Sequence, residues 1–357
     1  MGDVIGQGRV ITPDGVVSGE VWTDAGRIVE VRPADDVPDQ WVCPGFIDLQ
    51  VNGTHGIDVG AAPERVGEMA EWLPGEGTTS FLPTVITCDE PRRSRAISAA
   101  AAGWSGAGTT RAAPLGLHLE GPVLSSRRRG AHPARHLASA ASVAGEDWSP
   151  DGGVVMATLA PELPGALELI AELTSAGVVV ALGHTDATAG EFQAGLDAGA
   201  THVTHLFNAM RPFGHRDPGP IGVVLADDTV TAGLICDGLH VDPVAVRMAW
   251  RALGADRLTL VTDAVAARGT RPLPDGIRTA EGVLAGSAIT LDAALRNLIA
   301  ATGASVPEAV ATVTSTPARV LDLHDRGVIT PGARADVTVL DRELQVLETH
   351  VAGERIV

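Results

Sequence analysis

The stretch VVVALGHTDAT at residues 178–188 decides the fold class of this chain. It opens with a run of apolar residues, three of them β-branched, and stops on a histidine, His184. A continuous apolar run of this kind is typical of a strand buried on both faces, as in a parallel sheet. An imidazole at the end of such a strand is costly to bury without a partner, and a metal ion is a good partner.

The same pattern recurs along the chain. Four further apolar runs end on a charged or imidazole side chain: Glu120 in GLHLEGP, His205 in THVTHLFNAM, His240 in AGLICDGLHV and Asp263 in LTLVTDAV. Polar groups at the ends of several strands predict an active site that is assembled from many strands rather than from one loop.

Eight apolar segments of the middle of the chain qualify as strands, and helix-like stretches separate most of them. The segments are GFIDLQV, TTSFLPTVIT, LGLHLEGP, VVMATLAPE, VVVALGHT, HVTHLF, VTAGLIC and LTLVTDAV. Alternating strands and helices imply a parallel sheet, and eight such units favour a closed TIM-like (β/α)8 barrel of the α/β class. A doubly wound open sheet is the alternative, although no GxGxxG turn supports it.

The two ends of the chain share a different texture, with short alternating segments broken by Pro-Asp-Gly and Asp-Ala-Gly turns. We expect residues 1–43 and 324–357 to pair into one small β-sandwich domain. Residues 44–323 would then form the barrel domain.

Composition narrows the class of partner. The chain has 357 residues, 45% of them hydrophobic, and a formal net charge of −18, which argues against nucleic acid or an anionic membrane as a partner. The first residues lack the pattern of a signal peptide, and no apolar run approaches the roughly 20 residues that span a bilayer. The 3 cysteines are odd in number and form no CxxC pair, which fits a reducing cytoplasm.

Glu120, His184 and His205 together form a common ligand set for a catalytic zinc or a similar divalent ion. The sequence therefore predicts one divalent metal, with zinc expected and iron, manganese or cobalt compatible. Taken singly, each residue also fits a satisfied polar group at a strand end. All 26 basic residues are arginine, so no lysine is available as a carbamylated metal ligand.

Two further strand-end residues fit roles in acid-base chemistry. Asp263 is placed to take a proton from water and later return it to a leaving group; its alternative role is a helix N-cap. His240 is placed to donate a hydrogen bond to a carbonyl oxygen; its alternative is a loop histidine.

Two basic stretches follow predicted strands at the same end of the barrel. They are SSRRRGAHP and RPFGHRDPG, at residues 125–133 and 211–219. In so acidic a chain, local clusters of arginine suggest an anionic group such as a phosphate. Solvated charged loops are the alternative.

Taken in order, the motifs of this chain resemble the N-acetylglucosamine-6-phosphate deacetylase branch of the amidohydrolase superfamily. The motifs are PGFIDLQVNG, HLEGP, GAHP, GHTDAT, THLFNAM, DGLHV, LVTDA, LAGS and TSTPARVLDL. Each is unspecific alone, but the ordered set spans nearly the whole chain. The resemblance implies hydrolysis of N-acetylglucosamine 6-phosphate to glucosamine 6-phosphate and acetate, in amino-sugar catabolism or cell-wall recycling.

The resemblance also implies roles for matching residues. Glu120, His184 and His205 would be metal ligands, Asp263 the general base and then acid, and His240 the group that polarises the acetyl carbonyl. Substrate contacts are implied for His132, Asn208, Ala209, Arg216, His240, Leu284, Ala285, Gly286 and Ser287. His132 and Arg216 would hold the sugar phosphate across the interface of a homodimer.

One departure from the wider superfamily concerns the first strand. Many members carry a His-x-His motif there, whereas this chain has Gln50-Val51-Asn52. We therefore expect a single-metal site, with Gln50 and Asn52 as hydrogen-bonding groups beside it. Two alternatives remain open: an amidohydrolase that acts on another N-acylated sugar phosphate or a cyclic amide, and a non-catalytic barrel with a binding role.

Overall fold

The computed structural model describes residues 2–357 except 105–110, 272 and 274. All eight predicted strands form, and they pair in parallel in the order of the sequence. They are β5 (Phe46–Val51), β8 (Thr78–Ile86), β10 (Leu117–Glu120), β11 (Val154–Leu159), β12 (Val179–Leu182), β13 (His202–Val203), β14 (Thr231–Leu234) and β15 (Leu258–Leu260). A parallel bridge between Val51 and Ala264 brings the last strand to the first, so the barrel is nearly closed. The predicted fold class is confirmed.

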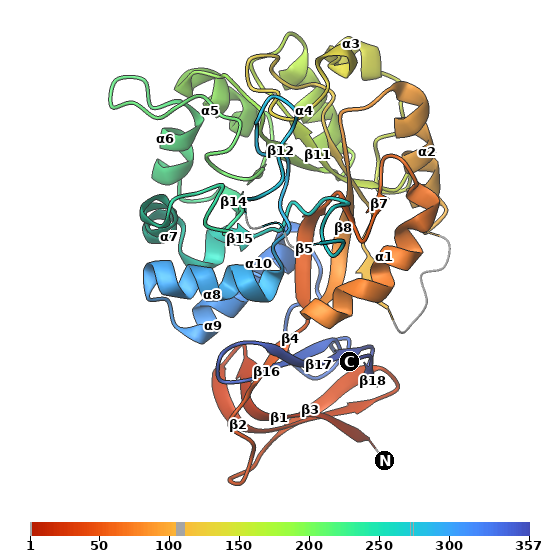
Figure 1. The fold of residues 1–357 in the computed structure, drawn as a ribbon, viewed down its shortest axis with the longest axis vertical. Helices are drawn as coiled ribbons and strands as arrows, with labels where there is room; N and C mark the ends of the chain where they lie inside the picture. The colour runs from red at the N-terminus through yellow and green to blue at the C-terminus, as the bar shows by residue number, and fades with distance from the viewer. Residues whose placement is uncertain (1, 105–110, 272, 274) are drawn as a thin grey trace.

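Helices surround this barrel (Figure 1). They are α1 (Val66–Trp72), α2 (Glu90–Ala101), α3 (Ala140–Val143), α4 (Ala166–Ser175), α5 (Ala189–Asp197), α6 (Gly219–Ala226), α7 (Pro243–Arg257), α8 (Leu291–Thr302), α9 (Val306–Ala311) and α10 (Ser315–Val320). Local sequence explains their limits: α5 begins at a capping box between Thr188 and Glu191, and the Asp242 side chain caps α7. No helix of the described residues has the length and apolar character needed to cross a membrane.

The inside of the barrel is packed with side chains. Ile47, Leu49, Leu82, Met156 and Val261 form an apolar cluster with almost no exposed surface. Because this cluster fills the barrel, a ligand can approach only from its ends. The carboxyl ends of the strands are the ends that carry the polar residues singled out above.

The two chain ends form one seven-stranded sheet below the barrel (Figure 1). Its order is β18 (Glu354–Arg355), β17 (Val346–Val351), β16 (Val337–Leu340), β4 (Trp41–Pro44), β1 (Asp3–Thr12), β2 (Gly15–Asp24) and β3 (Arg27–Pro33). The sheet curls around its own apolar core, and the backbone N–H of Ile28 donates to the Ala333 carbonyl at 2.9 Å across its open side. The exact domain boundaries stay a prediction.

Short elements complete the chain between the barrel strands. They are β6 (Gly53–Thr54), β7 (Ile57–Asp58), β9 (Ala113–Pro114) and the 3-10 turns Pro63–Arg65, Leu73–Glu76 and Ala134–His136. The β6–β7 hairpin directly follows Asn52, so the first strand end is tied to a defined turn.

Candidate active site

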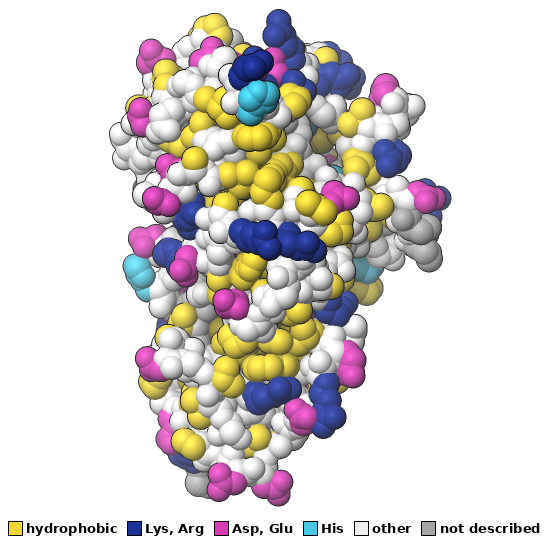
Figure 2. Space-filling model, turned by 90° about the vertical axis from the view of Figure 1, so that its left-hand side faces the viewer, with side chains coloured by type: hydrophobic (Ala, Val, Ile, Leu, Met, Phe, Trp, Pro, Cys, Tyr) yellow, Lys and Arg dark blue, Asp and Glu magenta, His cyan; other side chains and the backbone are white. Residues whose placement is uncertain are grey.

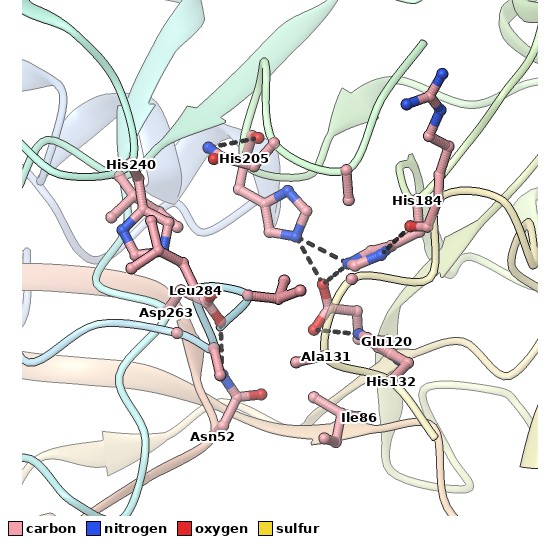
Figure 3. Close-up of a pocket in the computed structure, with 18 of the residues that line it drawn as sticks. Asn52, Ile86, Glu120, Ala131, His132, His184, His205, His240, Asp263 and Leu284 are labelled. Carbon is pink, nitrogen blue, oxygen red and sulfur yellow. Dashed lines mark hydrogen bonds and ion pairs between the residues drawn. The ribbon is translucent and has the colours of Figure 1, made fainter. Parts of the chain in front are cut away.

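A cavity of about 330 Å³ opens at the carboxyl ends of the barrel strands. All five strand-end residues that the sequence singled out line it: Glu120, His184, His205, His240 and Asp263 (Figure 3). They end or follow five different strands and come from positions as far apart in the sequence as Glu120 and Asp263. The barrel therefore does what the sequence predicted, which is to gather these side chains around one space.

Three of these residues have strained backbones. His184, His205 and Asp263 have φ values of +49°, +31° and +48°, in the left-handed region. A residue with a Cβ adopts this region at a cost of roughly 1–3 kcal/mol, and such residues concentrate at functional sites. Each lies within three residues of the end of its strand, where the chain turns beside the cavity.

Glu120, His184 and His205 converge on one point. His184 Nδ1 lies 2.9 Å from the Arg128 carbonyl, which only accepts hydrogen bonds, so this nitrogen carries the ring proton. The other nitrogen, Nε2, then offers its lone pair to the cavity. It lies 3.1 Å from Glu120 Oε1 and 3.1 Å from His205 Nε2, and His205 Nε2 lies 2.9 Å from the same carboxylate oxygen.

This donor set fits a divalent cation. The ligand atoms all lie within 4.8 Å of one another, and the three side chains are buried. Burial lowers the pKa of His184 to about 4, so the ring stays neutral as a metal ligand must be. Burial alone would raise the pKa of Glu120, but the neighbouring side chains of His132, His184 and His205 hold it well below its usual range. A buried carboxylate and two imidazole lone pairs need a positive partner, which a metal ion would supply.

The His132 ring faces the Glu120 carboxylate, although the sequence predicted that it would contact the sugar phosphate. Its Nδ1 accepts from the Thr87 backbone N–H at 3.2 Å, and because a backbone N–H can only donate, the ring proton is on Nε2. That nitrogen lies 3.7 Å from Glu120 Oε2. His132 lines the cavity, but its buried ring faces a carboxylate.

Asp263 accepts two amide hydrogen bonds on the same oxygen. Gln50 Nε2 donates to Oδ1 at 3.0 Å and Asn52 Nδ2 donates to it at 2.6 Å. Burial, and then the charge of Glu120, raise the pKa of Asp263 to about 7, in the range where a carboxylate can both take up and release protons at neutral pH. The N-cap alternative is wrong, because the next described helix after Asp263 begins only at Leu291.

His240 has a partner that sequence reasoning missed. Asp237 Oδ2 lies 2.7 Å from His240 Nδ1, and Asp237 Oδ1 accepts the backbone N–H groups of Leu239 and His240, each at 2.8 Å. These contacts outweigh burial and hold the pKa of Asp237 below its usual value. The DGLH motif carried this signal, since a carboxylate three residues before a histidine in a tight turn is placed to bind its ring. His240 does lie in a loop, between β14 and α7, but its ring is held by Asp237 and lines the cavity.

The predicted loop residues divide into two groups. Asn208, Ala209, Leu284, Ala285 and Gly286 line the cavity. Ser287 is buried behind it, where its hydroxyl donates to the Thr262 carbonyl at 2.5 Å and its N–H donates to the Asp263 carbonyl at 2.9 Å. Ser287 thus holds the loop against the Asp263 backbone rather than facing a ligand.

Gly286 is required for that close approach. Its φ is +65°, and a Cβ at this position would lie 2.6 Å from the Asp263 carbonyl oxygen. Any larger residue would push the loop away from Asp263.

Arg216 is exposed and is not among the described residues that line the cavity. Arg127 and Arg128 of the same chain do line it, and both bind Asp186, at 3.2 and 2.7 Å. Apolar side chains that carried no chemical signal in the sequence complete the wall: Ile86, Ile235, Val265 and Val283. The structure thus brings together the metal, base and carbonyl groups and His132, but of the two predicted phosphate residues it leaves Arg216 outside the cavity.

Comparisons with known proteins agree with this geometry. The amidohydrolase family model matches residues 41–356. A relative from Bos taurus, an N-acetylglucosamine-6-phosphate deacetylase, is 38% identical over 98% of this chain and 94% of its own. The chain belongs to the N-acetylglucosamine-6-phosphate deacetylases of the amidohydrolase family.

Solved deacetylase structures show the same fold over the whole length. The N-acetylglucosamine-6-phosphate deacetylase of Thermotoga maritima matches with a TM-score of 0.92 at 31% identity, covering 99% of both chains. A mutant of the Mycobacterium smegmatis deacetylase, in complex with N-acetyl-D-glucosamine-6-phosphate, matches with a TM-score of 0.90 at 33% identity, covering 98% of both chains. The family predicted from the ordered motifs is confirmed, and with it the expectation of an enzyme.

Proposed function

We propose that this chain hydrolyses the N-acetyl group of N-acetylglucosamine 6-phosphate and releases glucosamine 6-phosphate and acetate in amino-sugar metabolism. The observation that carries the proposal is the convergence of Glu120, His184 and His205 beside Asp263 and His240 in one cavity. The comparisons support the substrate, because the relatives carry the name of this activity and one related structure holds this sugar phosphate.

Glu120, His184 and His205 would hold the divalent cation, for which zinc is our expectation. When bound, the ion would lower the pKa of a water molecule and withdraw electrons from the acetyl carbonyl. The first strand offers no histidine pair for a second ion, because Gln50 and Asn52 stand there and their amide nitrogens donate to Asp263. This supports the single-metal type.

Asp263 and His240 would move and hold the protons. The oxygen of the attacking water bonds to the acetyl carbon, and Asp263 accepts the proton that this water loses. His240 donates a hydrogen bond to the carbonyl oxygen as negative charge develops there. The C–N bond then breaks, and Asp263 passes its proton to the departing nitrogen. Asp263 Oδ1 already accepts hydrogen bonds from the Gln50 and Asn52 side-chain amides, so Oδ2 is the oxygen left for this proton transfer.

Asp237 would act through His240. Its carboxylate lies 2.7 Å from Nδ1 and holds the ring in place, which leaves Nε2 to face the carbonyl oxygen. We expect Asp237→Asn to lower kcat about 100-fold with a small change in KM, because one donor to a developing oxyanion is worth roughly that much. Steady-state rates of acetate release between pH 6 and 9 measure the effect.

Asp242→Asn is the matched control for that variant. Asp242 lies five positions further along and caps α7 through the Val244 N–H at 2.8 Å, a contact that asparagine keeps. It should retain nearly full turnover. Equal rates in the Asp237 and Asp242 variants would show that His240 needs no carboxylate partner.

The phosphate would be held partly by a second copy of the chain. Arg216 extends from the loop between β13 and α6 and does not line the cavity of its own protomer. Exposed apolar side chains lie in the same loop, at Phe213 (55% exposed), and in or just before α7, which packs on α6, at Leu239 (44%), Val244 (69%) and Met248 (43%). Figure 2, which faces the left-hand side of Figure 1 where α6 and α7 lie, shows hydrophobic side chains gathered in a band. A homodimer would cover them and carry Arg216 to its partner's cavity. Substrate contact by His132 stays a prediction.

A complementation experiment tests this sharing. Arg216→Ala alone is expected to raise KM for the phosphorylated substrate about tenfold or more, as loss of a charged hydrogen bond implies. Dimers that pair an Arg216→Ala protomer with an Asp263→Asn protomer should regain activity. In such a dimer the site of the Arg216→Ala protomer has its own intact Asp263 and receives the intact Arg216 of its partner. Arg127→Ala, whose arginine lines its own cavity, should show no such recovery. Recovery in neither mixture would contradict a shared site.

The activity itself is tested by acetate release from a panel of N-acetylhexosamines. We expect the 6-phosphate to be preferred over free N-acetylglucosamine by about 100-fold in kcat/KM, since arginine contacts to phosphate are worth roughly 1.5–3 kcal/mol each. Faster hydrolysis of a cyclic amide, or equal rates without the phosphate, would overturn the assignment.

The proposal places the reaction in the cytoplasm. Its support is the state of Cys43, Cys88 and Cys236, which are all free thiols. Unpaired cysteines of this kind suit a reducing compartment.

A further inference from the structure

Two cavity residues carry a buried side-chain atom without a partner among the described residues: His205, through Nδ1, and Asn52, through Oδ1. Asn52 is 5% exposed and lines the cavity, yet its side-chain oxygen Oδ1 accepts no hydrogen bond from any part of the chain that the structure describes. A buried carbonyl-type oxygen without a donor costs about 1–3 kcal/mol. Such an atom in the wall of an active site is placed to accept from a ligand.

The direction of this oxygen is fixed by its surroundings. The Asp263 carboxylate accepts hydrogen bonds, so the amide nitrogen of Asn52 must face it, at 2.6 Å, and the amide oxygen must face the other way. Figure 3 shows that oxygen on the side of Ile86, a residue that also lines the cavity.

The backbone makes Asn52 and Asp263 one rigid unit. The N–H groups of Asn52 and Gly53 both donate to the carbonyl of Ala264, at 2.8 and 3.0 Å. The Asn52 oxygen therefore keeps its place relative to the Asp263 carboxylate, and it cannot turn to another donor without breaking the 2.6 Å contact.

The reaction brings one N–H donor close to Asp263, to which Asn52 is hydrogen-bonded. The nitrogen that Asp263 protonates at the end of the reaction must lie close to Asp263, and in the substrate that nitrogen carries one N–H. We propose that Asn52 Oδ1 accepts the N–H of the scissile amide and so selects amides over esters. The inference rests on the proposed function, because it uses Asp263 as the proton donor to the departing nitrogen.

The contact would strengthen as the reaction proceeds. When Asp263 protonates the nitrogen of the tetrahedral intermediate, that nitrogen carries a positive charge until the C–N bond breaks, so its N–H is then a better donor. An interaction that is stronger in the transition state than in the bound substrate raises kcat rather than lowering KM. Asn52 would thus act on the substrate directly, in addition to holding Asp263.

The test compares an amide with its ester. N-acetylglucosamine 6-phosphate and 2-O-acetylglucose 6-phosphate differ at the bridging atom, and the ester oxygen has no hydrogen to donate. For Asn52→Leu, we expect kcat for the amide to fall about tenfold more than kcat for the ester, which corresponds to one hydrogen bond of about 1.4 kcal/mol.

Gln50→Met is the matched control. Gln50 donates to the same Asp263 oxygen at 3.0 Å but is not among the described residues that line the cavity. The Gln50→Met variant measures how much the loss of one hydrogen bond to Asp263 by itself changes the ratio of kcat for the amide to kcat for the ester. An Asn52→Leu ratio that shifts no more than the Gln50→Met ratio would overturn the proposal. If the wild type does not deacetylate the sugar phosphate at all, the proposed function fails instead, so the two failures are distinct.

Discussion

Asp263→Asn is expected to lower kcat by about 1,000-fold or more while the protein keeps its fold and its metal. Asparagine has the shape of aspartate, and its amide oxygen can still accept the Gln50 and Asn52 hydrogen bonds. It can neither accept the proton of water nor return one to the nitrogen. General acid-base catalysis contributes roughly 100- to 10,000-fold per group, and Asp263 would serve in both steps.

Three measurements on one preparation check this result: acetate release, metal content and the melting temperature. A normal melting temperature with one bound metal excludes a folding defect. Turnover within tenfold of wild type in such a preparation would remove Asp263 from the proton path.

The second large effect concerns the metal ligands. Glu120→Gln removes the only negative charge among the three donors, so the remaining set is two neutral imidazoles and an amide. We expect the purified variant to lose its metal on dialysis and to lose acetate release about 1,000-fold or more, because metal activation of water is lost with the ion. Elemental analysis beside the rate measures both quantities.

Glu162→Gln provides the comparison. Glu162 follows β11 near the same end of the barrel, but its carboxylate binds Thr185 and the Asp186 N–H, at 2.6 and 2.7 Å, and lies outside the donor cluster. Its variant should keep stoichiometric metal. Loss of metal from both variants would mean that metal binding depends on the negative charge of this region as a whole rather than on Glu120 as a ligand. Treating the wild type with a chelator should abolish activity, and adding zinc should restore it.

The sequence predicted the barrel because the strands are marked by strong, local signals. A run such as 178–182 is apolar throughout, and β12 forms at Val179–Leu182. The polar residues at strand ends stand out against these runs for the same reason. Once the strands are known to be parallel, the geometry of the barrel brings Glu120, His184 and His205 together without further information.

Other parts of the site depend on contacts that no local pattern encodes. Gln50 and Asn52 meet on one oxygen of Asp263 only because the first and last strands close the barrel, 213 and 211 residues apart. The ring proton of His132 is fixed by the backbone N–H of Thr87, from a different loop. Ile86 ends its strand with a side chain that carries no chemical signal at all. Asp237 is the exception, since its spacing to His240 was visible in the sequence.

Anomalous diffraction at the zinc edge, from crystals grown with zinc, tests the central claim most directly. The account predicts one strong peak among Glu120, His184 and His205, and no peak beside Gln50 and Asn52. A second peak of similar height at the first strand, or a peak that touches none of the three side chains, would contradict it.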